Sequence, residues 1–252
     1  MKNLMLILLL APFALCAQES MGYPMFTNIM LTPNMAEIAE LEAGLKEHNQ
    51  KYHQDGAAGA RVYWVMNGVN SDNYVWTMGP HTWATMDEME MGGDHFDHWN
   101  NAVLAHTTGT VTHTWRFYPD KSNFSEDFKL KYLNVFIADM ARFQNETFMR
   151  VVDQVREVYA QKMADVPYGI YFNTMATSDG MDFAWVDFFD KMTFMGEGDE
   201  FPAWFEEVHG SGSFPKFLED WQTASVSETT ELWMYREDLS GLGADVAAAD
   251  RQ

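Results

Sequence analysis

The chain contains a single cysteine, Cys16, and few basic residues. Because Cys16 lies in an N-terminal segment that we expect to be removed, the mature chain has no thiol for disulfides, zinc ribbons or nucleophilic catalysis. Lys and Arg together number 16 against 37 Asp and Glu, which gives a formal net charge of −21. This charge argues against nucleic acid and against anionic membrane surfaces as partners.

The chain has one long apolar run, residues 4–15, which follows Lys2. The run is too short to span a bilayer as a mature helix and is typical of a secretory signal peptide. We expect residues 1–17 to be cleaved off, which predicts a secreted or periplasmic protein without a membrane span. The alternative is a lipoprotein acylated at Cys16, and it is disfavoured because Leu15 stands where a small residue is expected.

The sequence repeats itself. Four segments of the first half recur in the same order in the second: 28–29 with 134–135, 74–76 with 183–185, 93–99 with 198–204 and 115–117 with 233–235. Two copies of one supersecondary unit are the simplest explanation. We assign the first unit to residues 18–123 and the second to 124–240, and we expect a disordered acidic tail at 241–252.

Each unit shows the order β-α-β-β-α-β. Strands are expected at 24–31, 61–67, 73–78, 110–118, 130–138, 168–174, 183–189 and 228–235, and the clearest helices at 34–52, 82–104 and 145–163. Asn34 is the expected cap of the first helix. This order is typical of a ferredoxin-like unit, an antiparallel sheet with both helices on one face. Since strand 62–66 is apolar on both sides, two units can close face to face. We predict an α+β fold of two tandem ferredoxin-like units forming a pseudo-dimeric α+β barrel.

This unit order, the tryptophan in Tyr74-Val75-Trp76-Thr77 and the aromatic helix after it resemble the dimeric α+β barrel superfamily, fused in tandem, especially its antibiotic-biosynthesis-monooxygenase-like and haem-degrading branches. Haem-degrading members use a strand-one Asn, a strand Trp and a helix-two His. Asn28, Trp76 and either His95 or His98 occupy similar places. The resemblance therefore implies haem as a candidate cofactor. The recurrence of Asn28 and Trp76 in the second unit, without a histidine, favours a structural role for both.

Seven of the eight histidines lie in the first unit, so we expect the site there. His95 and His98 are three residues apart and share one helix face, where both imidazoles can meet a divalent metal ion or haem iron. They are also the candidate catalytic residues if the protein is an enzyme. The alternative is a pair of exposed histidines on an acidic helix. His48 continues an apolar stripe and is expected to be a core histidine rather than a ligand.

Aromatic residues and histidines predict a cavity in the first unit. Alternation puts His113 and Trp115 on one face of the last strand. The candidate ligand-binding residues are Asn28, Tyr63, Trp64, Trp76, His81, Trp83 and His113. Aromatic walls with a few polar groups suit a small apolar or aromatic molecule. We therefore predict an exported binding protein for such a molecule. A cofactor-independent or haem-linked monooxygenase and a structural protein without a ligand remain as alternatives.

Overall fold

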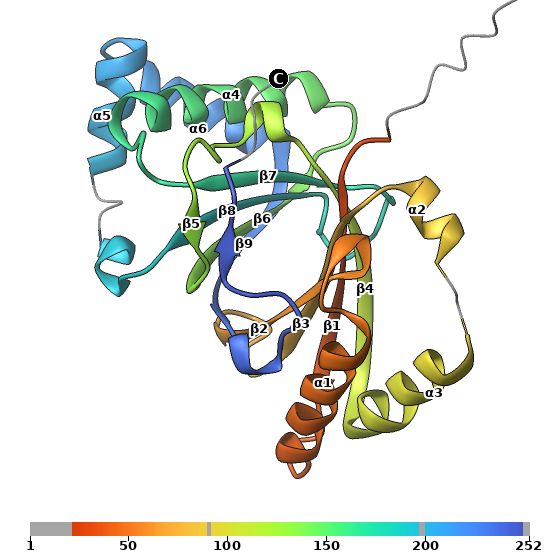
Figure 1. Cartoon of the computed structure of the whole chain (residues 1–252). Coiled ribbons are helices and arrows are strands. Elements are labelled where there is room, and N and C mark those ends of the chain that lie inside the picture. The colour runs from red at the N-terminus through yellow and green to blue at the C-terminus, as the bar shows by residue number, and fades with distance from the viewer. Residues whose placement is uncertain (1–21, 90–91, 197–199, 249–252) are drawn as a thin grey trace, which may run out of the picture.

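The protein is described by a computed structural model over residues 22–89, 92–196 and 200–248 (Figure 1). The expected signal peptide, residues 1–17 with Cys16, lies outside the described residues. Eight strands form a closed antiparallel barrel in the order β1-β3-β2-β9-β6-β8-β7-β4. The barrel lies between the helices of the two units (Figure 1).

Both units follow the same element order. The first contains β1 (Met25–Pro33), α1 (Ile38–Tyr52), β2 (Ala60–Asn67), β3 (Tyr74–His81), α2 (Trp83–Glu88), α3 (Gly93–Ala102) and β4 (Thr107–Phe117). The second contains β6 (Tyr132–Met140), α4 (Asn145–Lys162), β7 (Tyr168–Asn173), β8 (Phe183–Phe189), α5 (Phe201–His209), α6 (Ser213–Ala224) and β9 (Ser225–Tyr235). The two sheets join where β2 pairs with β9 and β4 with β7. The predicted pair of ferredoxin-like units closed into an α+β barrel is confirmed.

Strands such as β2, β3 and β8 are apolar on both faces because each separates two cores. Inward side chains such as Val65, Val135 and Trp233 fill the barrel interior. Outward side chains pack against helices: Trp76 lies in one core with Leu41 and Leu45 of α1, and the core of the second unit combines α4 with β7 and β8. Period-2 alternation between two apolar environments explains the near-continuous hydrophobic strands of the sequence.

Helix α1 begins later than expected, at Ile38. Asn34 does not cap it; instead its Oδ1 accepts a hydrogen bond from the Ala36 amide, and its carbonyl accepts one from the Glu37 amide. The local turn therefore competes with the helix for the backbone of these residues. Farther along α1, Gly44 touches α3 so closely that a Cβ there would lie 1.7 Å from the Ala102 carbonyl oxygen. This contact fixes the spacing of α1 and α3.

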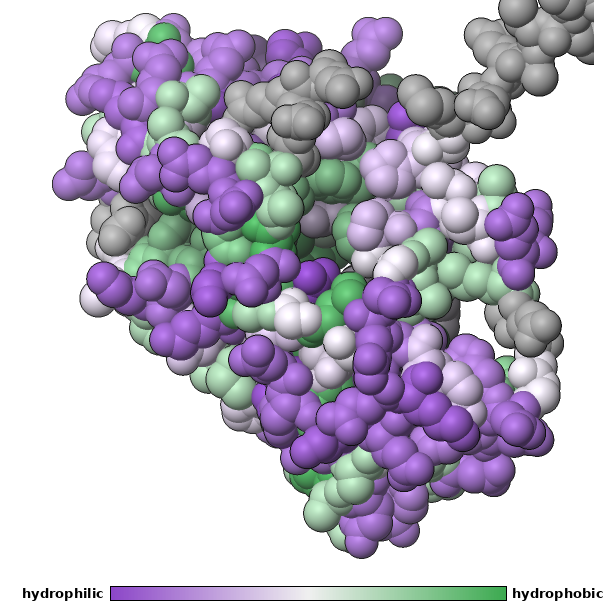
Figure 2. Space-filling model, in the orientation of Figure 1, coloured by the Kyte–Doolittle hydropathy of each residue, from purple (hydrophilic) through white to green (hydrophobic). Residues whose placement is uncertain are grey.

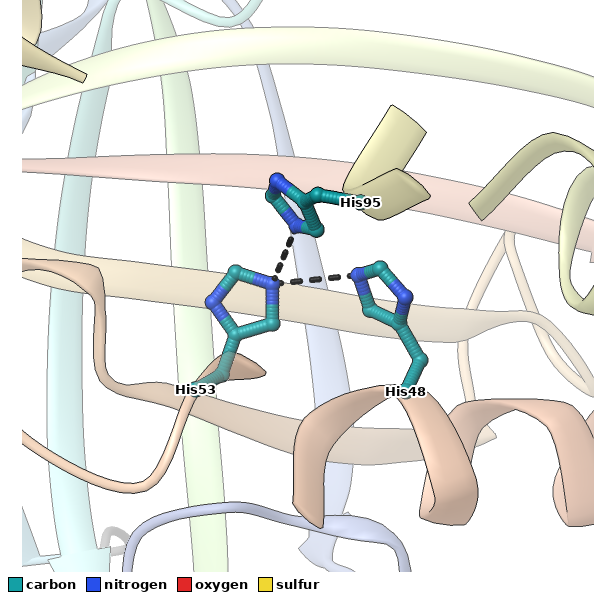
Figure 3. A group of neighbouring side chains, drawn as sticks. All are labelled: His48, His53 and His95. Atoms are coloured by element: carbon teal, nitrogen blue, oxygen red, sulfur yellow. Dashed lines mark hydrogen bonds between the residues drawn. The ribbon is translucent and has the colours of Figure 1, made fainter. Parts of the chain in front are cut away.

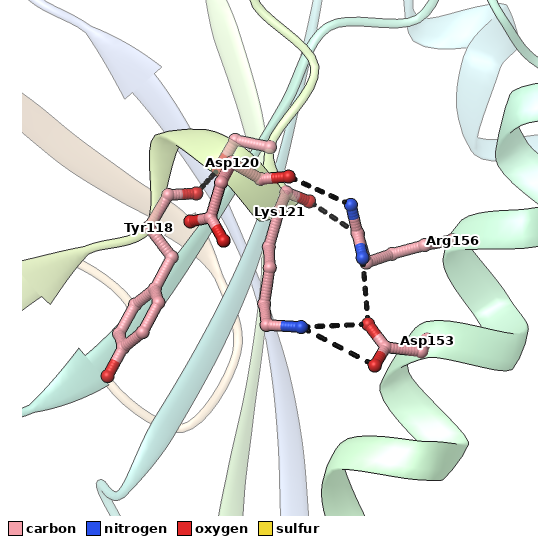
Figure 4. A network of polar contacts seen from close by, with 6 residues as sticks. Tyr118, Asp120, Lys121, Asp153 and Arg156 are labelled. Atoms are coloured by element: carbon pink, nitrogen blue, oxygen red, sulfur yellow. Dashed lines mark hydrogen bonds and ion pairs between the residues drawn. The ribbon is translucent and has the colours of Figure 1, made fainter. Parts of the chain in front are cut away.

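The segment that joins the units is held to α4 by a polar network (Figure 4). The Lys121 Nζ lies 3.0 Å from an Asp153 carboxylate oxygen, and Arg156 donates to the same oxygen at 2.7 Å. Arg156 also donates to the Lys121 carbonyl at 2.7 Å. Burial favours the neutral acid at Asp153, but hydrogen bonds from Arg156 and Lys121 outweigh it and lower the pKa. The short helical turn Pro119–Lys121 is thus anchored where the first unit ends.

The structure describes the first part of the tail that we expected to be disordered, residues 241–248, while residues 249–252 lie outside the described residues. Strand β10 (Asp245–Val246) pairs with β5 (Phe128–Lys129), and the Leu242 amide donates to the Ala60 carbonyl. A glycine is needed on this path, because a Cβ at Gly241 would lie 2.1 Å from the His53 carbonyl oxygen. Small residues in this tail therefore allow close backbone packing.

The predicted match of Asn28 with Asn134 is wrong by one residue. Strand β1 starts at Met25 and β6 at Tyr132, so Asn28 corresponds in position to Val135. Asn28 and Val135 both line the barrel interior, whereas Asn134 faces the helices of the second unit. A slip of one residue moves a side chain to the other face of a sheet. Asn28 therefore has no polar counterpart in the second unit.

The surface reflects the acidic composition. In the view of Figure 2, hydrophilic residues cover most of this face and hydrophobic residues gather toward its middle, over the barrel. Across the described ranges 22–89, 92–196 and 200–248, none of the helices combines the length and the hydropathy that a membrane-spanning segment requires.

Candidate functional site

Three histidines of the first unit meet between α1 and α3 (Figure 3). His48 lies in the last turns of α1, His53 directly follows that helix, and His95 lies in the first turn of α3. The Nε2 atom of His53 is 3.1 Å from the Nε2 of His48 and 3.1 Å from the Nε2 of His95. One ligand atom from each of the three residues falls within 4.8 Å of the other two. We call these residues the three-histidine cluster.

The backbone fixes the protonation of His53. Its Nδ1 lies 2.6 Å from the Ala58 carbonyl oxygen, which can only accept a hydrogen bond. Nδ1 must therefore carry the proton, and in the neutral ring Nε2 presents its lone pair to the other two histidines. A carbonyl that holds the outer nitrogen is the usual way in which proteins orient a metal-binding imidazole.

The outer nitrogen of His48 is also held, by a second imidazole. The Nδ1 of His48 is 3.2 Å from the Nδ1 of His98, and the Nε2 of His98 is 3.4 Å from a Glu47 carboxylate oxygen. If His48 uses Nε2 to bind a cation, its Nδ1–H donates to His98, whose Nε2–H in turn points to Glu47. Every proton in this chain then has an acceptor. We call it the His48–His98–Glu47 chain.

The cluster is held in the neutral form that binds metals. Burial, and then the neighbouring imidazoles, lower the pKa of His48 to about 3. Burial lowers the pKa of His53 to about 4, against the opposing bond to Ala58. The pKa of His95 is lowered by burial and by His98. At neutral pH the three rings are uncharged, so no proton must be displaced before a cation binds.

Aromatic side chains surround the cluster and fix the end of α1. The rings of Trp76 and Trp99 lie 5.0 Å from those of His53 and His48 respectively. The Trp76 indole donates to Asn49 Oδ1 at 2.8 Å, and Asn49 donates to the Leu239 carbonyl at 2.7 Å. Asn49, fully buried, therefore joins the helix that carries His48 both to the sheet and to the C-terminal segment.

The geometry suits a first-row transition metal. Two Zn–N bonds of about 2.0–2.1 Å at a tetrahedral angle place the nitrogens about 3.3 Å apart, close to the 3.1 Å that separates the His53 Nε2 from the Nε2 atoms of His48 and His95. Three protein ligands also leave a coordination position for water or another molecule, as in catalytic metal sites. The cluster is therefore a candidate metal centre with an open position.

The sequence placed only part of this centre. His95 and His98 were both predicted as ligands. His95 lies in the three-histidine cluster, whereas His98 lies behind His48 and contacts its Nδ1. His48 is buried, at 1% exposure, as expected for a core histidine, yet its Nε2 faces the cluster. His53 was not predicted. Its only sequence signal was the concentration of histidines in the first unit.

The seven candidate ligand-binding residues do not form one site. Asn28, Tyr63 and His113 line a cavity of about 110 Å³ inside the barrel. Trp64 and Trp76 point to the opposite, helix-covered side. His81 is buried beside Thr27, with Nε2 2.9 Å from the hydroxyl, and Trp83 is partly exposed and donates to the Tyr23 hydroxyl.

The residues that the resemblance associates with haem are divided between two environments. Asn28 faces the barrel interior, whereas Trp76 and His95 lie on the helix side of the sheet. These side chains therefore cannot contact one haem together. The residues present do not fit that site.

A larger cavity, of about 490 Å³, lies in the second unit between its sheet and helices. Its walls are mainly aromatic and aliphatic, and no histidine is among the described residues that line it. Asp187 is buried in it, at 3% exposure, and accepts hydrogen bonds from the Trp185 indole at 2.7 Å and from Asn134 at 3.2 Å. Burial outweighs these bonds and raises the pKa of Asp187 to about 6.

Comparison with solved structures identifies the fold. A provisionally assigned monooxygenase from Lactobacillus acidophilus superposes with a TM-score of 0.52 at 10% identity, over 89% of this chain and 99% of that one. A second such protein, from Fusobacterium nucleatum subsp. nucleatum, gives a TM-score of 0.55 at 6% identity over 91% and 100%. Chlorite dismutase from Candidatus Nitrospira defluvii, in complex with imidazole, gives 0.51 at 9% identity over 87% and 95%.

These similarities are similarities of fold, because all three identities are low. The sequence matches no protein-family model and no curated protein. The chain thus has the tandem α+β barrel architecture of chlorite dismutase and of these monooxygenase-assigned proteins. Its histidines must be interpreted from their own geometry.

Proposed function

We propose that this protein binds one divalent transition-metal ion through His48, His53 and His95 of the first unit, with at least one coordination position open to water or a small ligand. The observation that carries this proposal is the convergence of three imidazole Nε2 atoms while the outer nitrogens of His53 and His48 are held by Ala58 and His98. Without a cation, the single lone pair on the His53 Nε2 faces the Nε2 atoms of both His48 and His95, so these nitrogens cannot all be well hydrogen-bonded. A metal ion satisfies all three lone pairs at once.

The donor set narrows the choice of ion. Imidazole nitrogens suit Zn²⁺, Cu²⁺, Ni²⁺, Co²⁺ and Fe²⁺, whereas Mg²⁺ and Ca²⁺ prefer oxygen ligands. The similar structures are named as a monooxygenase and as chlorite dismutase, and both names denote redox enzymes. Fe²⁺ and Cu²⁺ therefore belong in the test beside Zn²⁺.

The test is a metal titration of the purified, chelator-treated chain, followed by isothermal calorimetry and by elemental analysis after desalting. One ion per chain is expected, together with a rise in melting temperature that grows with free metal concentration. Co²⁺ adds a spectroscopic readout, because its d–d bands report the number and kind of ligands.

Variants locate the site. His95→Ala is the primary variant because His95 is the least buried member of the cluster, so its removal costs the fold least. Binding is expected to weaken at least 100-fold. His209→Ala, in the second unit, is the matched control and retains full binding. No stoichiometric binding, or the same affinity in His95→Ala and His53→Ala as in the unaltered chain, contradicts the proposal.

A second candidate function is binding of a small apolar or aromatic molecule, favoured by the 490 Å³ cavity with the buried carboxyl of Asp187. For this second function the apolar ligand is proposed to bind in the second unit, whereas the sequence predicted a site in the first. A neutral naphthalene-based fluorophore is expected to bind there, and Val155→Trp, which fills the cavity, to abolish its binding. His95→Ala serves as the control that leaves it unchanged.

We also propose that the chain is exported from the cytoplasm. A cleaved signal peptide delivers the chain to a compartment outside the cytoplasm. Expression with residues 1–17 intact, followed by N-terminal sequencing of the exported product, is expected to give Gln18 as the first residue. An uncleaved cytoplasmic product, or one that starts at an acylated Cys16, contradicts this assignment.

A further inference from the structure

The barrel interior contains a polar row that the metal centre does not use. His113 on β4, Asn28 on β1 and Thr77 on β3 are direct cross-strand neighbours, because Asn28 pairs with His113 on one side and with Thr77 on the other. All three line the cavity of about 110 Å³ inside the barrel. The polar groups thus form one strip across a wall of the cavity.

Two oxygens of this row lack hydrogen-bond partners. The Asn28 Oδ1 and the Thr77 Oγ1 are buried and, within the part of the chain that the structure describes, form no hydrogen bond. Buried polar atoms are normally paired, and unpaired ones disfavour the folded state unless water or a ligand satisfies them. An amide oxygen can only accept, so the missing partner is a donor.

The remaining walls are apolar or neutral. Leu133, Val135 and Val186 come from the second unit, and aromatic rings complete the lining. Burial raises the pKa of Tyr63 to about 12, so its phenol is uncharged. Since a charged molecule would lose its hydration here without a counter-ion, the lining selects a neutral molecule.

The cavity adjoins an opening at one end of the barrel. A basin of about 270 Å³ at that end shares Met30, His113, Ile137 and Met181 with the inner cavity. The Nε2 of His113 lies 2.7 Å from Asp179 Oδ2, on the β7–β8 connection. Met181 belongs to the same connection. The His113–Asp179 pair therefore stands between the basin and the cavity.

We propose that the barrel interior binds a small neutral aromatic molecule that carries a hydrogen-bond donor, of the phenol class, and that this molecule enters past the His113–Asp179 pair. The donor bonds to Asn28 Oδ1, and the ring packs against the apolar wall. The cavity of about 110 Å³ is smaller than a dry apolar cavity of about 150 Å³ that is known to bind benzene, so one six-membered ring is the upper limit of size. Met30 and Met181 have flexible side chains that can move to admit such a ring. This site is independent of the metal centre.

The test compares phenol with benzene, which has the same ring without the donor, by calorimetry and by the fluorescence of the lining tryptophans Trp115 and Trp233. Phenol is expected to bind at least 10-fold more tightly than benzene. Asn28→Leu removes the acceptor at similar size, and the preference for phenol is expected to disappear. Val135→Phe fills the cavity and abolishes binding of both. Thr32→Val, exposed at the end of the same strand β1, is the matched control and changes neither affinity.

Other outcomes overturn the proposal. If neither probe binds at millimolar concentration, buried water satisfies Asn28 and Thr77 and no ligand site exists. If phenol binds but Asn28→Leu and Val135→Phe have no effect, it binds elsewhere. Asp179→Asn tests the entry path: the rates of phenol association and dissociation are expected to rise together, severalfold, with the dissociation constant unchanged. Unchanged rates refute the entry path, and so does a change in only one of the two rates, because the dissociation constant then changes. His95→Ala leaves phenol binding intact, which separates this site from the metal centre.

Discussion

His98 is the sharpest test of the proposed metal centre, because the structure assigns it a hydrogen bond rather than a metal bond. Its Nδ1 faces the Nδ1 of His48 at 3.2 Å. Replacing His98 with Leu removes the acceptor for the outer proton of His48 while keeping a similar volume. Loss of such an outer partner typically lowers metal affinity by about 10–100-fold, or about 1.4–2.7 kcal/mol. Stoichiometry stays at one ion.

A conservative variant separates this effect from mere packing. The Oδ1 of an Asn at position 98 can take the place of the imidazole Nδ1 and accept the same proton, so His98→Asn is expected to retain nearly full affinity. Glu47→Gln has only a small effect, because the carboxylate is 72% exposed and lies 3.4 Å from His98, and exposed ion pairs contribute about 0–1 kcal/mol.

The assay is competition with a chelator of known affinity at pH 7.5, with the Co²⁺ spectrum as a check on the ligand set. In His98→Leu the spectrum keeps its shape and only the affinity changes. The reasoning is refuted if Leu and Asn weaken binding equally, since packing alone then explains the loss. It is also refuted if the Co²⁺ spectrum of His98→Leu shows one nitrogen fewer, since His98 is then itself a ligand.

Three further predictions concern stability and coupling. Because the folded-state pKa values of His48 and His53 lie below the ordinary value near 6.5, their contribution is fully present above pH 6.5. This contribution to the free energy of unfolding is lost as pH falls from 6.5 toward 4, by about 1.4 kcal/mol per pH unit for each group. Denaturant unfolding of the metal-free chain across this pH range, compared with that of His53→Gln, measures the loss. Equal pH slopes in the two proteins contradict the prediction. The pH dependence that Asp187 contributes has the opposite sign, because its pKa of about 6 exceeds the ordinary 3.8. The protonated carboxyl stabilises the fold below pH 4, and about 3 kcal/mol of this stabilisation is lost as pH rises to 6. Asp187→Asn is expected to remove that pH dependence in the same unfolding assay. Gly44→Ala forces α1 and α3 apart at the Ala102 carbonyl and lowers the free energy of unfolding by about 1–3 kcal/mol. Because α3 carries His95, calorimetry is expected to show weaker metal binding as well. Ala43→Gly lacks this clash and is expected to retain the metal affinity.

The fold was predictable because its signals are local. Alternating apolar residues marked the strands, and the second unit repeated the order of the first. Strand 183–189 was predicted at its observed bounds. The start of α1 was missed because Asn34 forms its own turn, and the order of residues 241–248 depends on contacts with Ala60 and β5 that composition does not reveal.

The site was only partly predictable because its ligands come from different elements. His95 and His98 were paired through their spacing on one helix, but the actual neighbours of His95 are His53, beyond the end of α1, and His48, within it. That meeting depends on the packing of α1 against α3 at Gly44. No periodicity encodes such a contact, and only the concentration of histidines in the first unit pointed toward it.

The same buried tryptophan has different hydrogen-bond partners in the two units. In the first unit the Trp76 indole bonds to Asn49, which fixes the end of α1 beside His48 and brings the helix onto the sheet. In the second, the Trp185 indole bonds to Asp187 on its own strand, two residues away. Asp187 also accepts a hydrogen bond from Tyr159 of α4, yet a cavity of about 490 Å³ remains between the sheet and the helices. Precise placement of three imidazoles requires a helix end that is held by such bonds. The first unit thus holds the end of its helix on the sheet beside the histidines, whereas the second leaves a cavity between sheet and helices that suits an apolar ligand.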